Sequence, residues 1–339
     1  MSAKKLFKSA TMVSLILGLF VVTALIAWQG AGVIGEAVLG VGYGIFAVVG
    51  FHFVPIALAA LAWWVLFKPS VPAGVPFFVI ARWVREGVNT LLPVAQIGGD
   101  VVGARILIQR GGSTNTVSAS LFVDKTLEVF SQFFVALAGV ILLFDGGDRE
   151  WLGNALIGLL ILFPLLVGFL LAQRWGLLRL TEKLLVKLTG TGAMPQADIA
   201  GIHDAAWAMY RHGPRCASGL VLHTLAWGAG AAEIWLILYF MGYPVGWVEA
   251  FALEALGQAI RSAAFAMPGA LGAQEAGYMI LAPMVGLGPE IGLALSLVKR
   301  VRHVMLGVPA LLIWQFLEGR HLFKGRRKSD ANQQAGHHG

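Results

Sequence analysis

Charged residues are scarce in this 339-residue chain, and cysteine is almost absent. Asp, Glu, Lys and Arg make up 13% of the sequence, whereas soluble proteins average about 25%. The single cysteine, Cys216, excludes an internal disulfide and a cysteine-based metal site. With 58% hydrophobic residues and a mean hydropathy of +0.76, the composition excludes a soluble domain of this size. It predicts a polytopic membrane protein.

The motifs of common enzyme classes are also missing. The sequence contains no G-x-x-x-x-G-K-[ST] loop for ATP, no G-x-S-x-G nucleophile elbow and no H-E-x-x-H zinc motif. It has no basic face interleaved with aromatic residues, so nucleic acid is not an expected partner. The formal charge of +7 suits a cytoplasmic membrane surface instead. We therefore expect no enzyme activity, no cofactor and no metal.

Long apolar runs predict an all-α bundle with about six full membrane crossings, each needing about 20 apolar residues. The expected spans are about 10–28, 43–67, 117–144, 151–172, 216–240 and 290–316. Basic residues before the first span and after the last one place both termini in the cytoplasm. We expect one domain over 1–339, with a basic cytoplasmic connection at 173–215 and a disordered cytoplasmic tail at 325–339.

Two polar stretches, 82–100 and 258–275, interrupt the apolar background in the same way. In each, an acid follows a proline (Pro93 or Pro268) by seven residues, and an arginine precedes that proline by seven or eight. Lipid tolerates broken helices only where protein or a water-filled cavity satisfies the backbone. We expect two re-entrant or broken helix pairs facing one site, related by an inverted repeat as in secondary transporters. An interfacial helix at the first stretch, or a plain bundle of eight to ten spans, remains an alternative.

Helical periodicity places polar residues on three shared faces. The sets are Arg82, Glu86 and Asn89; Asp124, Glu128 and Gln132, with Lys125 beside them; and Glu254, Gln258 and Arg261. Charged residues at membrane depth usually mark a pathway or a binding site. Ion pairing within the protein is an equally good reading of each residue taken alone. His52, close before Pro55, is more typical of a packed helix distortion than of a ligand.

Arginines, carboxylates and amides in this pattern suit an amphiphile whose polar head enters the protein. Arginine binds phosphate or carboxylate through its planar fork, and the helix after Pro268 offers N–H donors. His223 and Glu233 are either site residues or partners of each other. The expected substrate-binding residues are Arg85, Glu86, Asn89, Asp100, Arg105, Gln258, Arg261 and Glu275. The residues expected to support the site or carry protons are Asp124, Glu128, Glu254, Lys299 and Arg300.

Several of these motifs resemble the flippase-like transmembrane domain of lysylphosphatidylglycerol synthases. They are Arg85-Glu86, Asn89, Pro93, Gly98-Gly99-Asp100, Arg105, Asp124-Lys125, Pro268-Gly269, Gly272 and Glu275. Asp124-Lys125 departs from the acid-arginine pair of that superfamily. Within it, the stretches 51–55, 253–262 and 295–300 are similar to hopanoid-biosynthesis-associated membrane proteins.

The resemblance implies a bacterial inner-membrane protein that moves or hands over hopanoid or another anionic or amphiphilic lipid. A homodimer and contacts with hopanoid-synthesis enzymes are further expectations. Lysyl-lipid synthesis is not expected, because the aminoacyl-transferase domain is missing. The sequence favours a lipid translocase without its own ATPase. The alternatives are a membrane enzyme that uses Asp100 and Glu275 as acid and base, and a scaffold acting through the basic region 174–215.

Overall fold

The computed structural model describes residues 39–67, 74–92, 98–143, 196–264 and 270–335. The secondary structure of these ranges is helical, as the sequence predicts. The elements are α3 (Gly44–Phe51), α4 (Phe53–Phe67), α5 (Val75–Leu91), α6 (Gly98–Ile108), α7 (Thr114–Leu143), α10 (Gln196–Arg211), α11 (Gly213–Phe240), α12 (Trp247–Ala263), α13 (Ala273–Leu281), the 3₁₀ helix η3 (Ala282–Val285) and α14 (Pro289–Ala335). The expected spans 10–28 and 151–172, and both prolines of the broken helices, lie outside the described residues.

Three helices of the described chain are long and apolar enough to cross a membrane: Gly44–Phe67, Thr114–Leu143 and Gly213–Phe240. They match the spans expected at 43–67, 117–144 and 216–240 to within a few residues. Large apolar side chains such as Phe46, Phe134 and Tyr239 are exposed on them. Exposed large apolar side chains on long apolar helices are typical of a membrane-facing surface. The chain is therefore an all-α polytopic membrane protein.

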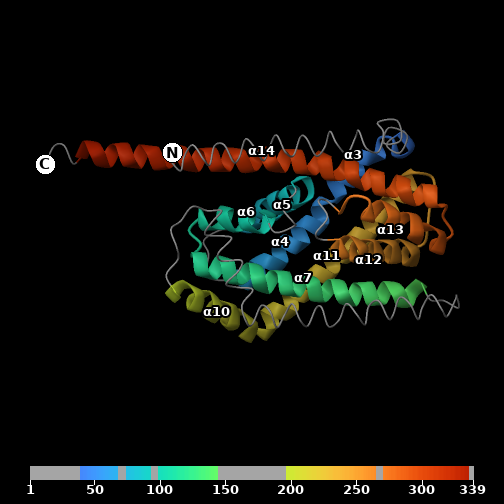
Figure 1. Ribbon diagram of the computed structural model, residues 1–339, viewed down its shortest axis with the longest axis horizontal. Helices are drawn as coiled ribbons and strands as arrows, with labels where there is room; N and C mark the ends of the chain where they lie inside the picture. The colour runs from blue at the N-terminus through green and yellow to red at the C-terminus, as the bar shows by residue number, and fades with distance from the viewer. Residues whose placement is uncertain (1–38, 68–73, 93–97, 144–195, 265–269, 336–339) are drawn as a thin grey trace.

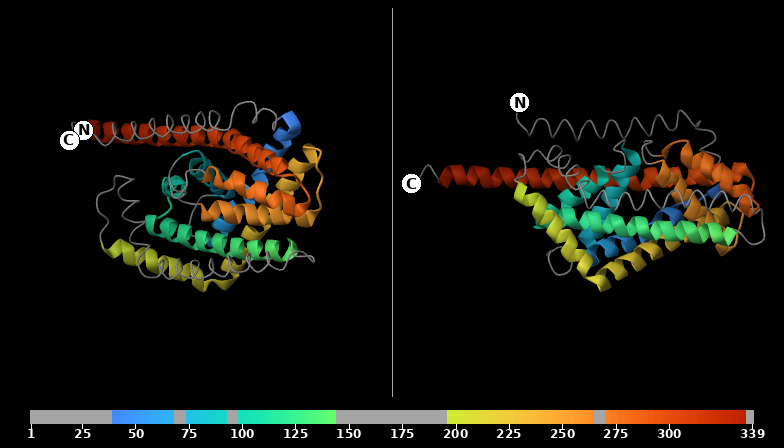
Figure 2. Two further views of the ribbon diagram at one scale, coloured as in Figure 1. Left: turned by 45° about the vertical axis from the view of Figure 1, so that its right-hand side comes forward. Right: turned by 60° about the horizontal axis from the view of Figure 1, so that its bottom comes forward.

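The helices form a bundle in which the first half of the sequence (α3 to α7) and the second half (α10 to α14) are interleaved. α14 and α7 run along opposite sides of the view in Figure 1, and α4 and α11 cross between them. The α5–α6 pair lies toward one end of the bundle and the α12–α13 pair toward the other (Figures 1 and 2). α5 packs against α14, and α12 packs against α7. Each helix pair therefore contacts the long helix that belongs to the other half of the sequence.

The first helix pair, α5–α6, is an antiparallel hairpin. Gly99 near the start of α6 approaches Arg85 and Asn89, whereas Gly103, one turn later, approaches Ala81. A side chain at position 99 would meet the Arg85 carbonyl oxygen at 2.1 Å, so only glycine permits this approach. The Gly99 N–H donates to Asn89 Oδ1 at 2.8 Å and joins the two helices.

The second helix pair, α12–α13, has the same antiparallel arrangement. Gly257 of α12 approaches the Tyr278 ring, and Ile260, one turn later, approaches Gly277. α13 begins at a sharp turn, with φ of 78° at Gly272, a conformation that glycine adopts without strain. Two short helices are thus paired at both places where the sequence predicts a broken helix pair.

Apolar clusters fill the two ends of the bundle, and polar side chains lie between them. On α14, Val298 belongs to one cluster and Leu311 to the other. The intervening segment 299–303 carries buried basic residues and a histidine. His52 lies in the same way between the apolar residues of α3 and those of α4. The long helices therefore place their charged residues midway along the bundle.

The last helix is longer than the sequence predicts. α14 extends to Ala335, well past residue 316, where the last span was expected to end. It therefore includes residues 325–335 of the tail that was expected to be disordered. The sequence after 316 contains no proline and several good helix formers such as Lys, Arg and Gln, which favour continued helix.

Candidate functional site

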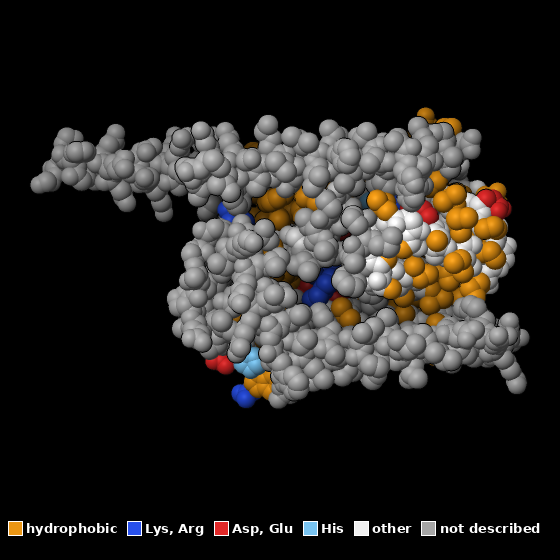
Figure 3. Space-filling model, in the orientation of Figure 1, with side chains coloured by type: hydrophobic (Ala, Val, Ile, Leu, Met, Phe, Trp, Pro, Cys, Tyr) orange, Lys and Arg blue, Asp and Glu red, His pale blue; other side chains and the backbone are white. Residues whose placement is uncertain are grey.

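A polar cavity of about 190 Å³ lies inside the bundle, between α4, α5, α7, α11, α12 and α14. Its walls carry five basic side chains and three carboxylates: Arg82, Arg85, Lys125, Arg261, Arg302, Glu86, Glu128 and Glu254. Basic side chains are visible in a recess near the middle of the face in Figure 3. The volume is sufficient for on the order of ten water molecules. The cavity can therefore hold water or a polar headgroup within an otherwise apolar bundle.

The three polar faces predicted from helical periodicity all point to this cavity. Arg82, Glu86 and Asn89 line it from α5; Glu128 and Gln132 line it from α7; Glu254, Gln258 and Arg261 line it from α12. Asp124 is buried behind the wall, where it pairs with a cavity residue. The shared faces are therefore confirmed, and the cavity is where they meet.

Arg85 contacts three carboxylates, one on α6 of the same hairpin and two on α7. Its Nε pairs with Asp100 of α6. Its Nη1 donates to Asp124 Oδ2 at 2.9 Å, and its Nη2 to Glu128 Oε2 at 3.3 Å. Only 3% of the Arg85 side chain is exposed, so these carboxylates replace most of its hydration.

Further cations compensate the two acids of α7. Arg82 Nη2 donates to Glu128 Oε1 at 2.6 Å, and Lys125 Nζ donates to Glu128 Oε2 at 3.0 Å. His223 Nε2 lies 3.0 Å from Asp124 Oδ1. Every carboxylate around the first hairpin thus has a basic partner, and Lys125 neutralises part of the α7 stripe as predicted.

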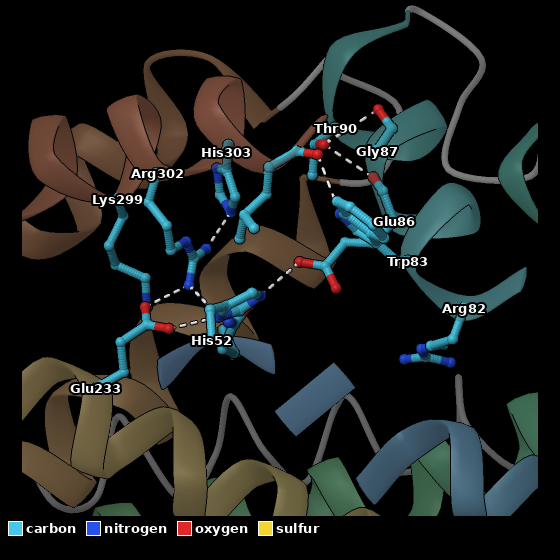
Figure 4. A network of polar contacts seen from close by, with 12 residues as sticks. His52, Arg82, Trp83, Glu86, Gly87, Thr90, Glu233, Lys299, Arg302 and His303 are labelled. Carbon is cyan, nitrogen blue, oxygen red and sulfur yellow. Dashed lines mark hydrogen bonds and ion pairs between the residues drawn. The ribbon is translucent and has the colours of Figure 1, made fainter. Parts of the chain in front are cut away.

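His52 links helices from both halves of the sequence inside the bundle (Figure 4). Its Nε2 lies 2.8 Å from Glu86 Oε1, and its Nδ1 contacts Glu233 of α11. Arg302 Nη1 also contacts Glu233 and lies 2.7 Å from His52 Nδ1. Figure 4 shows these side chains converging from α5, α11, α14 and the junction of α3 with α4. His223 and Glu233 are therefore not partners of each other.

The helix distortion expected at His52 is present. α3 ends at Phe51 and α4 begins at Phe53. Pro55 has no N–H to donate to the preceding turn, which explains the local break. His52 is nevertheless more than a packing residue, because the break places its ring between two carboxylates.

Glu275, at the start of α13, is engaged within the protein. It accepts from Arg300 Nε at 2.8 Å and from the Gly272 N–H at 2.8 Å. Arg300 Nη2 also donates to the Ala270 carbonyl at 3.1 Å. The expectation that this helix start offers its N–H donors to a ligand is therefore wrong for Gly272, whose N–H is used internally.

Glu254 and Arg261 line the cavity from α12. Glu254 accepts from Lys299 Nζ at 2.6 Å and from Gln258 Nε2 at 2.8 Å. Arg261 Nη1 lies 3.2 Å from His303 Nε2. α12 therefore presents to the cavity both the Glu254 carboxylate, which is paired with Lys299, and the Arg261 guanidinium.

The two halves carry their charges at matching sequence intervals. α7 places polar residues 24, 25 and 28 positions after Asp100, and α14 places them at the same distances after Glu275. The matched pairs are Asp100 and Glu275, Asp124 and Lys299, Lys125 and Arg300, and Glu128 and His303. Both acids of α7 are thus replaced in α14, one by lysine and the other by histidine.

The expected site residues fall into two groups. Five of the eight expected substrate-binding residues line the cavity: Arg85, Glu86, Asn89, Gln258 and Arg261. Asp100 and Glu275 form ion pairs behind the wall, and Arg105 pairs with Glu318 of α14 at 2.6 Å. Of the expected supporting residues, Glu128 and Glu254 line the cavity, while Asp124, Lys299 and Arg300 are partners of acidic or basic neighbours.

Several central residues belong to neither of the two sets expected from the sequence, although Arg82 lies on a predicted polar face and His223 and Glu233 were possible site residues. They are His52, Arg82, His223, Glu233, Arg302 and His303. Most lie within apolar sequence, so an ionisable side chain at membrane depth is the signal that could have found them. Within the described residues, no group of three or more His, Cys, Asp or Glu side chains could hold a metal ion.

The fold and site define a polytopic α-helical membrane protein with an ion-paired cavity between two helix hairpins. Residues 15–310 match the family described as the lysylphosphatidylglycerol synthase transmembrane region, and the chain belongs to this family. No curated protein and no solved structure matches the chain. Family membership thus confirms the wider resemblance drawn from the sequence and places the chain among lipid-related, flippase-like membrane proteins.

Proposed function

We propose that this chain is a lipid translocase of a bacterial inner membrane, with both termini in the cytoplasm. A lipid headgroup enters the polar cavity while its apolar tail stays in the bilayer. The observation that carries this proposal is the cavity itself, because ionisable residues gathered inside membrane-spanning helices usually mark a transport path. Membership of a lipid-related family supports the same conclusion.

The interleaved halves provide a route for alternating access. Since α5 packs against α14 and α12 packs against α7, movement of one hairpin displaces the long helix of the other half. His52 and its contacts Glu86, Glu233 and Arg302 join helices of both halves beside the cavity. In secondary transporters with opposed repeats, rocking of one repeat against the other opens a central site to each side in turn. No ATPase is needed for this movement.

We propose a hopanoid or a related amphiphile as the substrate. Two of the stretches similar to hopanoid-associated proteins, 51–55 and 253–262, contribute His52, Glu254 and Arg261 to the cavity. Support for the substrate therefore comes from the same residues that support the transport path. A polyol, amino or acidic headgroup would find hydrogen-bond partners among the carboxylates, amides and guanidinium groups there.

The test uses purified protein in liposomes that contain a fluorescent lipid. A membrane-impermeant reagent quenches the outer leaflet, and translocation exposes the inner-leaflet label. Wild-type protein should increase the loss of signal, whereas R261Q should abolish this increase. E249Q changes a carboxylate on the same helix that does not line the cavity, so its transport should equal that of the wild type.

Three results would reject the proposal. They are normal transport by a folded R261Q variant, no exchange by wild-type protein with hopanoid or any other lipid, and a new lipid species in the vesicles. The last result would indicate an enzyme. Dependence on an imposed proton gradient would assign proton coupling to the carboxylates of the cavity. Exchange without a gradient would identify passive scrambling.

A further inference from the structure

Arg261 is compensated differently from the other arginines around the cavity. Arg82, Arg85 and Arg302 each lie within ion-pair distance of a carboxylate. Arg261 has no such carboxylate among the described residues; its hydrogen bond is with His303 Nε2, at 3.2 Å. Arg261 is partly buried, and a cation that is partly removed from water without a counter-charge destabilises the protein.

His303 explains how the protein tolerates this cation. Its Nε2 contacts both Arg261 and Arg302, and arginine is only a donor. Nε2 must therefore accept, which makes the ring neutral with its proton on Nδ1. A neutral imidazole can orient two guanidinium groups, but it cannot cancel their charge.

The guanidinium of Arg261 is open to the cavity. A guanidinium has five N–H donors, and the hydrogen bond to His303 uses only one of them. Gln258 and Ser262 line the same part of the wall. Gln132 Nε2 donates to the Ser262 hydroxyl oxygen at 2.7 Å, so the Ser262 O–H is free to donate elsewhere. An additional acceptor with negative charge would complete this arrangement.

The first half shows what a completed arrangement looks like. Glu128 stands at the position that matches His303, and it accepts from both Arg82 and Arg85. The second half therefore has the cation but lacks the carboxylate at the corresponding place. An anion from outside the chain can take the role that Glu128 has in the first half.

We infer that Arg261, oriented by His303, forms a binding subsite for an oxyanion, a phosphate or a carboxylate. This inference rests on the proposed translocation and adds that the transported headgroup carries a negative charge. The planar fork of arginine matches the paired oxygens of either group. The Ser262 hydroxyl supplies a further donor to the same ligand.

The experiment measures binding of two labelled lipids to the purified full chain in detergent micelles. One is phosphatidic acid, and the other is diacylglycerol with the same tails and label but without the phosphate. Fluorescence anisotropy follows each titration. Wild-type protein should bind phosphatidic acid roughly tenfold or more tightly than diacylglycerol, as expected for charge-assisted hydrogen bonds.

Two variants at one position separate charge from shape. H303E places a carboxylate beside Arg261, as Glu128 does beside Arg85, and should reduce binding of phosphatidic acid to the level of diacylglycerol. H303Q keeps a neutral acceptor and should retain the preference. R261Q removes the guanidinium and gives an independent loss if H303E does not fold. Equal binding of both lipids by wild-type protein, or an unchanged preference in R261Q, would overturn the inference.

Inorganic phosphate identifies the source of the oxyanion. Competition by phosphate alone, lost in R261Q, means that the subsite recognises the free anion as well. Competition only by unlabelled phosphatidic acid assigns recognition to the lipid headgroup. The liposome assay keeps the two proposals distinct. If wild type and H303E transport neutral and acidic lipids at equal rates, translocation stands and the oxyanion subsite is rejected. If lipid binding depends on Arg261 but no lipid is transported, the subsite stands and translocation is rejected.

Discussion

The two helix hairpins present an arginine to the same cavity in opposite electrostatic settings. Arg85 of the first hairpin is held by Asp100, Asp124 and Glu128. Arg261 of the second hairpin has a neutral histidine as its hydrogen-bond partner. Similar backbone arrangements thus carry a cation that is fully compensated in one half and a cation open to a ligand in the other.

The difference originates in the long helices that follow each hairpin. α7 carries two acids where α14 carries Lys299 and His303 at the matching positions. Lys299 is used to compensate Glu254 of the neighbouring helix, and Arg300 compensates Glu275. Glu254 and Glu275 of the second half are therefore each paired with a basic residue of α14, and neither is an ion-pair partner of Arg261. The first half thus pairs its arginine within the protein, and we propose that the second half leaves Arg261 available for a ligand.

The largest effect is expected from R85Q. This change removes the shared cation from the buried Asp124 and Glu128 and from the partly exposed Asp100. Arg82 and Lys125 still reach Glu128, and His223 still contacts Asp124. Breaking a buried pair costs about 3–5 kcal/mol, and three carboxylates are affected here. Chemical unfolding in mixed micelles should show a loss at the upper end of that range, or no folded protein at all.

R261Q is the matched control for that experiment. It removes a cation that has no described carboxylate within ion-pair distance, so the stability of the protein should stay the same or rise. Equal losses of stability in R85Q and R261Q would show that both arginines are structural, and the contrast between the two halves would be wrong.

The next effect is expected from R300Q in the second half. Arg300 holds both Glu275 and the carbonyl of Ala270, whose φ of 49° is unusual for a residue with a side chain. Its loss leaves a mostly buried carboxylate with the Gly272 N–H, and we expect a cost of about 3 kcal/mol. Unfolding of R300Q and R300K should be compared. Lysine should restore part of the stability, because it keeps the charge but not the fork.

Much of the fold could be predicted from hydropathy and helical periodicity. The spans at 43–67, 117–144 and 216–240 required only the length of apolar sequence. The shared polar faces followed from the spacing of residues such as Glu254, Gln258 and Arg261, since a helix brings such positions together. These are local properties, and one sequence contains them fully.

The partners of the charged residues could not be predicted in the same way. Glu233 and Arg302 are 69 residues apart, and His52 and Arg302 are 250 apart. Such pairs depend on how the two halves interleave, which no local pattern encodes. Asp100 and Glu275 look like site residues because they end conspicuous motifs. In the structure neither acid lines the cavity, and each pairs with an arginine, Asp100 with Arg85 and Glu275 with Arg300.

A smaller effect is expected from G99A in the first hairpin. An added methyl group would meet the Arg85 carbonyl and the Asn89 side chain at less than 3 Å, so α5 and α6 must separate. Overpacking of this kind costs about 1–3 kcal/mol. G103A is the control on the same helix, because its nearest neighbours lie at 3.5 Å, which is ordinary contact. If G103A lost as much stability as G99A, helix crowding at this crossing would not explain the loss.

The smallest effect is expected from K125Q, although Lys125 occupies the position that matches Arg300. The side chain of Lys125 is 35% exposed, and Glu128 keeps Arg82 and Arg85 when it is removed. Partly exposed pairs contribute about 0–1 kcal/mol, so unfolding of K125Q should stay within about 1 kcal/mol of the wild type. A loss of stability as large as that of R300Q would mean that Arg82 and Arg85 alone do not neutralise Glu128. In that case Glu128 would depend on all three cations, and the first hairpin would be no more robust than the second.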